Sequence, residues 1–187
     1  MENEEMKPSY WPSVIQAAII VAVVTTVVGL GLVYYVAGSE PSMGVMMISG
    51  LTIPITCLIG LIGGILATRS YAKAFDITFP IGTGAQIGLF TGIIAALVGG
   101  IIGQIWNLVD PTLMERFADT MIGAFEMNDQ IPESQKDEII TSMEESFEDQ
   151  SSMGGILKGI AINAGVLGFV NLLSGMIGAK IFASEEE

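Results

Sequence analysis

The sequence has no histidine, a single cysteine and only seven lysine and arginine residues among 187. Without histidine, and with Cys57 alone, the chain lacks the residues for the usual zinc, haem and histidine-based catalytic sites. One cysteine also excludes a disulfide within the chain, and its apolar surroundings favour a small buried hydrophobe over a reactive thiol. The shortage of basic residues, at a net charge of −13, excludes nucleic acid as a partner because a phosphate backbone requires lysine and arginine to neutralise it.

Charge of either sign is scarce outside one segment. Charged residues make up 14% of the chain and hydrophobic residues 51%, whereas a soluble domain carries roughly 25% charge. The mean hydropathy is +0.63. This composition predicts a membrane protein. The acidic start of the chain, followed by a long apolar run, predicts a first spanning helix rather than a cleaved signal peptide.

Four apolar segments are long enough to cross a bilayer, which requires about 20 residues. They cover approximately 13–37, 43–68, 81–109 and 153–182, the last with its apolar centre at 159–179. A tight turn joins the first two, and the short polar stretch RSYAKAFDITFP joins the second to the third. We therefore predict an all-α membrane protein with four transmembrane helices in a compact bundle, which has the lipid bilayer as its surroundings.

The segment 110–152 breaks the apolar pattern. It holds twelve acidic residues against Arg116 and Lys136. Apolar residues still recur at helical spacing on both sides of a break at NDQIP, which predicts two short amphipathic helices outside the bilayer. Asp110 and Pro111 match an N-cap followed by proline at the first helical position. Disorder is the alternative, because acid-rich tracts with few aromatic residues often stay unfolded.

The acidic segment also raises the question of a metal site. Oxygen ligands of the kind that Ca²⁺ prefers occur together at Glu144, Glu145, Glu148 and Asp149. The spacing lacks the glycine turn of a calcium-binding loop, so a solvated helix face is the better interpretation. We predict no cofactor, no metal site and no catalytic residue.

Basic residues set the expected orientation, since loops on the cytoplasmic side carry the excess of lysine and arginine. With four spans, one side of the membrane holds Lys7, Arg69, Lys73 and Lys180. We therefore expect a multi-pass protein of the bacterial inner membrane. Its N-terminal tail, 1–12, and its acidic C-terminal tail, 183–187, are expected in the cytoplasm, and the segment 110–152 in the periplasm.

The third span carries the most regular pattern in the chain. Small residues recur there every four positions and so share one helix face: Gly84, Gly88, Gly92, Ala96 and Gly100. The second span repeats this spacing at Gly60 and Gly64, and the fourth begins with Gly155 and Gly159. Lipid tails are as apolar as leucine, so helices in a bilayer associate through close packing of small residues. We interpret the ridge as a helix-packing surface, within one chain or between copies. A glycine-lined pathway or hinge is the alternative.

Amide side chains interrupt the apolar spans, among them those of Gln86, Gln104, Asn163 and Asn171. Amides bond across helices, with a contribution on the order of 1 kcal/mol each. We interpret these residues as a polar seam between helices, and the lining of a cavity is the alternative. The centres of the spans contain no Asp or Glu, which argues against a proton relay or an ion-coupled pump.

Three stretches resemble a known family. They are the end of the third span with Trp106, Asn107, Asp110 and Pro111, the acidic run SQKDEIITSMEESFED, and the final SGMIGAKIF. Together they resemble the bacterial four-helix membrane proteins filed as domain of unknown function 4199, a family common among Bacteroidota. The resemblance covers almost the whole chain and implies the same four-span architecture, but it carries no activity, cofactor or catalytic residue. This chain departs from the family by ending in SEEE instead of a basic tail.

The sequence predicts a non-enzymatic inner-membrane protein with a structural role, either self-associating or as an accessory subunit of a larger membrane complex. The alternative is a small transporter or channel, with a pathway along the glycine-rich third span and the Asn and Gln positions. An intramembrane enzyme is disfavoured because no pair of nucleophile and base is visible.

Overall fold

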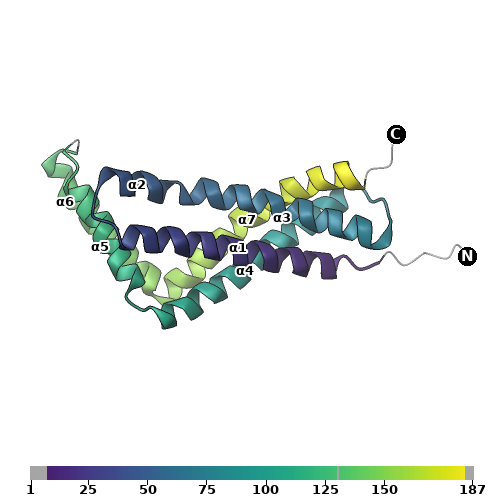
Figure 1. Cartoon of the computed structure of the whole chain (residues 1–187), viewed down its shortest axis with the longest axis horizontal. Helices are drawn as coiled ribbons and strands as arrows, with labels where there is room; N and C mark the ends of the chain where they lie inside the picture. The colour runs from purple at the N-terminus through teal and green to yellow at the C-terminus, as the bar shows by residue number, and fades with distance from the viewer. Residues whose placement is uncertain (1–7, 130, 184–187) are drawn as a thin grey trace, which may run out of the picture. The chain divides into compact units, whose positions relative to one another are not determined.

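The computed structural model of the chain describes residues 8–129 and 131–183. Over these residues the chain forms seven helices and no strand (Figure 1). In order they are α1 (Trp11–Ala37), α2 (Met43–Gly50), α3 (Thr52–Phe75), α4 (Ile81–Val109), α5 (Leu113–Glu126), α6 (Glu133–Ser151) and α7 (Met153–Phe182). Four stretches are long and apolar enough to cross a membrane, namely α1, α2 together with α3, α4, and α7. The predicted all-α membrane fold with four spans is confirmed. The predicted tails fall largely outside the described residues.

The second span differs from the continuous helix that the sequence predicts over 43–68. It is interrupted at Leu51, where α2 ends and α3 begins. Pro54 lies in the first turn of α3, where its missing N–H breaks no helical hydrogen bond, but it cannot donate to the carbonyl of Gly50 as a continuous helix would require. The proline therefore separates two helices within one apolar stretch.

At its other end, α3 extends seven residues beyond the predicted boundary and includes most of the polar connection. It ends at Phe75, and the next residue, Asp76, has a φ of 50°, which is the left-handed conformation that often terminates a helix. The N–H of Ile77 then bonds back to the carbonyl of Ala72 at 3.3 Å. The connection between the second and third spans is therefore much shorter than the sequence suggested.

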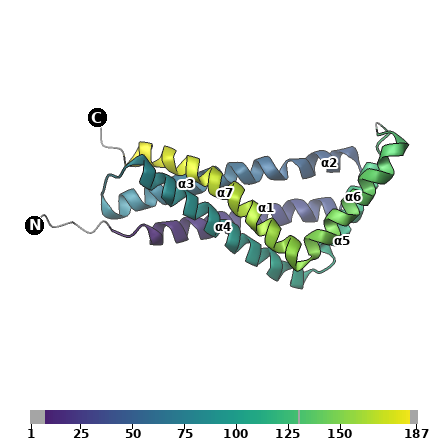
Figure 2. The same cartoon turned by 180° about the vertical axis from the view of Figure 1, so that it is seen from behind.

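The acidic segment forms two helices, α5 and α6, rather than a disordered loop (Figure 2). The predicted start of the first of them was wrong. Helix α5 begins at Leu113 with Thr112 at the N-cap position, and Thr112 makes no side-chain capping bond. The side chain of Asp110 bonds to other partners, so the Asp–Pro pair forms the turn before the helix instead of its first residues.

The chain forms two compact units. Unit 1 contains the described residues of 1–22, 58–98 and 164–187, and unit 2 contains those of 23–57 and 99–163. Each of the four spans contributes residues to both units. Unit 1 thus draws on parts of α1, α3, α4 and α7, whereas unit 2 draws on other parts of the same spans together with α2, α5 and α6.

Small side chains dominate the core of unit 1. Its buried hydrophobic residues form two clusters, Val14, Ala17, Ala67, Tyr71, Ala72, Phe79, Ile87, Ala179 and Ala183 in one and Ala18, Val21, Ala22 and Ala95 in the other. Alanine lets helix backbones approach one another closely, which suits packing in lipid. Two hydrogen bonds fasten both ends of the described chain to this unit. The Tyr71 hydroxyl donates to the carbonyl of Pro8 at 2.7 Å, and the N–H of Phe79 donates to the carbonyl of Ala183 at 3.0 Å.

Candidate functional site

The closest helix contact in unit 1 lies between α4 and α7. A Cβ atom placed on Gly88 would clash with the backbone carbonyl of Asn171, and one on Gly92 would clash with that of Leu167. One on Gly84 would meet the side chain of Ala179 and the carbonyl of Gly175. The contacts move backward along α7 as they move forward along α4, so the two helices run antiparallel. The α4 glycines therefore give room to the backbone of α7, not to a cavity.

Helix α3 packs on α7 in the same way. A Cβ atom on Gly64 would clash with the backbone of Asn171 and Gly175 and with the Ser174 hydroxyl, and one on Gly60 would lie 3.1 Å from Leu167. Gly178 of α7 lies in turn against Thr68. Three glycines of α7 also line these contacts, namely Gly168, Gly175 and Gly178. The four-residue pattern of small residues did not predict them, because they are spaced by seven and three residues rather than four.

Asn171 is the central polar residue of unit 1. Its side chain is fully buried, and the amide nitrogen Nδ2 donates to the carbonyl of Leu167 at 2.8 Å. The oxygen Oδ1 has no hydrogen-bond partner and lies against Gly63, where a Cβ atom would be 2.5 Å from it. A buried acceptor without a donor costs about 1–3 kcal/mol. Close packing and one bond to the backbone therefore hold the Asn171 side chain in place, and no second polar side chain among the described residues takes part.

The structure places the four amides of the predicted seam in different surroundings. Asn171 is buried in unit 1, whereas Asn163 is exposed and belongs to unit 2. Gln86 and Gln104 are also exposed on the surface of the chain. Three hydroxyl residues of unit 1 are fully buried like Asn171, namely Thr68, Thr91 and Ser174, and each donates to a backbone carbonyl of its own helix. Hydroxyls that bond back to their own helix satisfy their donors locally, and the polar seam stays a prediction.

Glycines in the spans of unit 2 have different surroundings. Five of them have no atom within 4 Å of a Cβ placed on them, namely Gly29, Gly31, Gly50, Gly103 and Gly159. Gly100, the last member of the predicted ridge, does contact α7, with a Cβ position 2.9 Å from the Ile160 side chain. Ala96, the ridge residue before it, is buried in unit 1. The atoms nearest to a Cβ on Gly155 belong to the backbone of Asp149 and Gln150, at the end of α6. The four-residue spacing therefore includes both contacting and open glycines.

A hydrogen-bonded network links three helices of unit 2 beside the end of α4. The indole N–H of Trp106 donates to the Tyr34 hydroxyl at 3.1 Å, and that hydroxyl donates to the Asp110 carboxylate at 2.9 Å. Arg116 of α5 donates to the same carboxylate oxygen at 2.7 Å. The Tyr34 hydrogen bond, assisted by Thr112 and Arg116, holds the pKa of Asp110 below its usual range, against a smaller opposing effect of desolvation. The ionised carboxylate thus fastens α1 and α5 to the end of α4.

Helices α5 and α6 are held together by a buried lysine and an aromatic pair. The ammonium of Lys136 donates to the carbonyl of Glu126 at the end of α5, at 2.9 Å, and to the Glu133 carboxylate at 2.8 Å. A cation at the C-terminus of a helix satisfies a free carbonyl and suits the helix dipole. The rings of Phe117 and Phe147 pack edge to face, 6.1 Å apart. Lys136 is therefore a structural residue of the pair.

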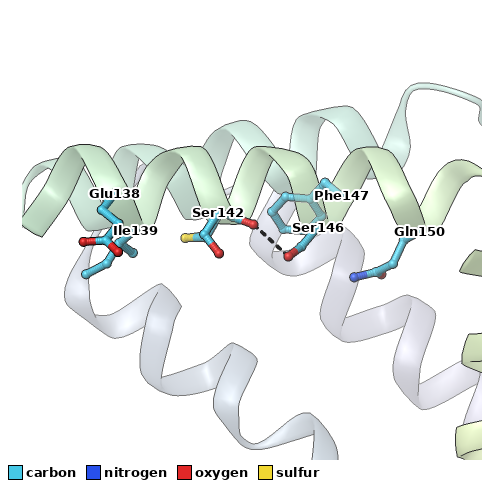
Figure 3. A pocket seen from close by; sticks show the side chains of 7 residues that line it. Glu138, Ile139, Ser142, Ser146, Phe147 and Gln150 are labelled. Atoms are coloured by element: carbon cyan, nitrogen blue, oxygen red, sulfur yellow. Dashed lines mark hydrogen bonds between the residues drawn. The ribbon is translucent and has the colours of Figure 1, made fainter.

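One side of α6 carries an open groove of about 380 Å³. Figure 3 shows side chains that extend from the same side of the helix into it. The lining residues are Glu138, Ile139, Ser142, Met143, Ser146, Phe147 and Gln150. In the described parts of the chain, no group of three or more Asp, Glu or Cys residues is placed to hold a metal ion. The groove is thus a surface of mixed apolar and acidic character.

Comparison with known proteins yields one match. The model of a family described as "Protein of unknown function (DUF4199)" matches residues 16–183. No curated protein and no solved structure matches the chain. The match runs from the first span to the end of α7 and includes the acidic segment, so it covers the architecture of both units rather than a single motif.

Proposed function

We propose that this chain, which belongs to the DUF4199 family of proteins of unknown function, is a non-enzymatic membrane protein that acts as a structural or accessory subunit of a larger membrane assembly. Membership confirms the resemblance carried by the end of the third span, the acidic run and the last span. The Bacteroidota origin that the resemblance implied stays a prediction. The family itself brings no activity to the chain, so the proposal depends on the geometry of the helices.

The observation that carries the proposal is the set of five open glycines in unit 2. Glycine in a helix interior costs about 1 kcal/mol relative to alanine in water, and in membranes it is favoured where another helix comes close. In unit 2 these glycines have no neighbour from their own chain. The exposed amides Gln104 and Asn163 lie on the same spans. Small residues and amides are the groups that membrane helices use to associate, which supports lateral packing against other helices.

A transport pathway along the glycine ridge has less support. The ridge at Gly84, Gly88 and Gly92 lies against the backbone of α7 at a separation that leaves no room for a methyl group. A solute could follow this face only if α4 and α7 separated. The amides proposed to line the pathway are also dispersed, since Asn171 is buried and Asn163 is exposed.

Extraction from native membranes is the direct test of the subunit role. The chain is solubilised in mild detergent, and its size and co-purifying partners are measured by size-exclusion chromatography with light scattering. We expect an assembly of fixed stoichiometry, either of several copies or with a second protein. Gly103→Leu should reduce the assembled fraction while the helical circular dichroism stays unchanged. A chain that leaves the membrane as a monomer, with no effect of Gly103→Leu, would overturn the proposal.

The proposal includes an inner-membrane location with the chain ends in the cytoplasm and α5 and α6 in the periplasm. Its support is the group of basic residues Arg69, Lys73 and Lys180 near the ends of α3 and α7, against an acidic insert. Single cysteines at Ser9 and Ser134, in a Cys57→Ala background, test it in intact cells with a membrane-impermeant maleimide. Labelling of position 134 with protection of position 9 is expected, and the reverse pattern contradicts the orientation.

A further inference from the structure

The groove on α6 has the length of a short helical segment. Its lining runs from Glu138 to Gln150, which is about 18 Å along a helix axis, or roughly three turns. The two small residues in its middle, Ser142 and Ser146, create the hollow between larger neighbours. The Ser146 hydroxyl donates to the carbonyl of Ser142 at 2.7 Å (Figure 3). The middle of the groove is therefore polar only in part, because the Ser146 hydroxyl already donates a hydrogen bond within the helix.

The two edges of the groove differ in chemistry. One edge carries Ile139, Met143 and Phe147 at four-residue intervals, and Phe147 is anchored by its contact with Phe117. On the other side Glu138 lines the groove, and Glu145 and Asp149 lie beside it on the same line of the helix, at intervals of seven and four residues. A ligand in the groove would thus meet an apolar stripe on one side and negative charge on the other.

The negative charge of α6 is not balanced within the helix. It contains seven acidic residues and one cation, Lys136. That cation is already bound to Glu133 and to the end of α5. The acidic edge is thus available to a cationic partner. The same charge repels anionic lipid headgroups and nucleic acid.

We propose that the α6 groove binds a basic amphipathic helix of another protein, about three turns long, with its apolar stripe on Ile139, Met143 and Phe147 and its lysine or arginine residues along Glu138, Glu145 and Asp149. This inference rests on the proposed subunit function and gives the partner a chemistry. Amphipathic helices bind apolar grooves through residues spaced by three, four and seven positions, and opposite charges at the edge set orientation and speed of association.

The binding test uses the full chain in nanodiscs of zwitterionic phosphatidylcholine, with empty nanodiscs as the baseline. The probe is a fluorescent 18-residue peptide of leucine, alanine and lysine with one apolar stripe. A second peptide replaces every lysine with glutamate, and a third scrambles the order so that the stripe is lost. We expect the basic striped peptide to bind at least about tenfold more tightly than either of the others, measured by fluorescence anisotropy. Equal binding of the striped and scrambled basic peptides would contradict a groove.

Two variants of matched charge locate the site. Glu138→Gln/Glu145→Gln/Asp149→Asn removes three charges from the groove edge. Asp137→Asn/Glu144→Gln/Glu148→Gln removes three from the opposite arc of the same helix. The first should weaken peptide binding about tenfold and the second less than about threefold, because short-range pairing exceeds the effect of net charge. An equal loss in both variants means non-specific attraction and overturns the inference.

A steric variant completes the test. Ser142→Trp fills the hollow without changing charge and should weaken binding by about tenfold or more, with unchanged helical circular dichroism. The outcomes separate the two proposals. If native membranes yield a stoichiometric partner that Ser142→Trp and the groove-edge variant still retain, the subunit function stands and the groove inference fails. If the chain is extracted as a monomer that binds the basic peptide in the groove, the subunit function fails while the site remains.

Discussion

The two units use glycine in opposite ways. In unit 1, nine of its eleven glycines lie so close to a neighbouring helix that a methyl group would be crowded, and for Gly84, Gly88 and Gly92 the neighbour includes the backbone of α7. In unit 2, the spans contain five glycines with no neighbour. The residue type and the apolar surroundings are the same in both. The difference shows that glycine spacing reveals the capacity for close contact, whereas the fold decides which of these contacts is made within the chain.

Polar side chains follow the same division. Unit 1 encloses Asn171 among glycines and hydroxyls, with one amide oxygen left without a donor. In unit 2, the half-buried Asp110 and the buried Lys136 each bind more than one partner. The polar groups of unit 1 are thus enclosed by its own helices, whereas Asp110 and Lys136 of unit 2 link separate helices.

The largest expected effect concerns the α4–α7 contact. Gly88→Leu places a side chain against the Asn171 carbonyl, a backbone atom that cannot rotate away. We expect a destabilisation of about 3 kcal/mol or more, seen as loss of the folded peak in fluorescence-detected size-exclusion chromatography after heating. Gly103→Leu is the matched control in the same helix and should change the stability of the isolated chain by less than about 1 kcal/mol. If both variants lost the same stability, the distinction between packed and open glycines would be wrong.

A smaller effect is expected at the unpaired oxygen of Asn171. Leucine has nearly the same branched shape as asparagine, so Asn171→Leu removes an unsatisfied acceptor at little steric cost. We expect a change within about 1 kcal/mol in either direction. Asn171→Asp buries a carboxylate among apolar groups and should cost at least about 3 kcal/mol. Thermal unfolding in detergent, followed by circular dichroism, measures both. A large loss in Asn171→Leu would show that Oδ1 has a partner, such as a buried water.

The smallest effect concerns the acid dependence of unit 2. The pKa of Asp110 is lower in the folded chain than its usual value of 3.8, so the ionised carboxylate stabilises the fold above about pH 4. This contribution is lost as the pH falls below that value toward the folded pKa. Asp110→Asn should therefore be less stable than the wild type at pH 7, and the difference should shrink as the pH falls below about 4.

The readout for this variant is local. Trp106 fluorescence in a Trp11→Phe background reports the network directly, because its indole N–H is bonded to Tyr34. Tyr34→Phe serves as the companion variant, since it removes the hydroxyl that links Trp106 to Asp110. If the gap between wild type and Asp110→Asn stayed constant from pH 7 to pH 2, the carboxylate would not be the group that fastens α1 and α5.

Much of the fold follows from the sequence because length and hydropathy are sufficient to identify a spanning helix. The break at Leu51 was missed because Pro54 is tolerated in a first helical turn, so its presence alone does not indicate two helices. The extension of α3 to Phe75 was missed for a related reason. Its polar residues are typical of a loop, and only the left-handed conformation of Asp76 marks where the helix ends.

The packing surface was harder to predict. The four-residue spacing of Gly84, Gly88 and Gly92 identifies the face of α4, but the same rule selects Gly155 and Gly159, which touch no other span. The opposite face on α7 is formed by glycines at other intervals. Which glycines meet depends on how far one helix is shifted along the other. The spacing of glycines within a single helix does not determine that shift. The polar seam stays a prediction, because the structure buries Asn171 but leaves Asn163 exposed on the same helix.

The position of α7 in unit 1 has a consequence for how the chain is made. Its backbone covers the glycines of α3 and α4, yet it is synthesised after both of them. Unit 1 is assembled from three stretches far apart in the sequence, and contacts of such long range form slowly. Until α7 enters the bilayer, the glycine faces of α3 and α4 lack the helix that they pack against. They therefore remain unpaired while α5 and α6 are synthesised, and this part of unit 1 closes only after α7 is inserted.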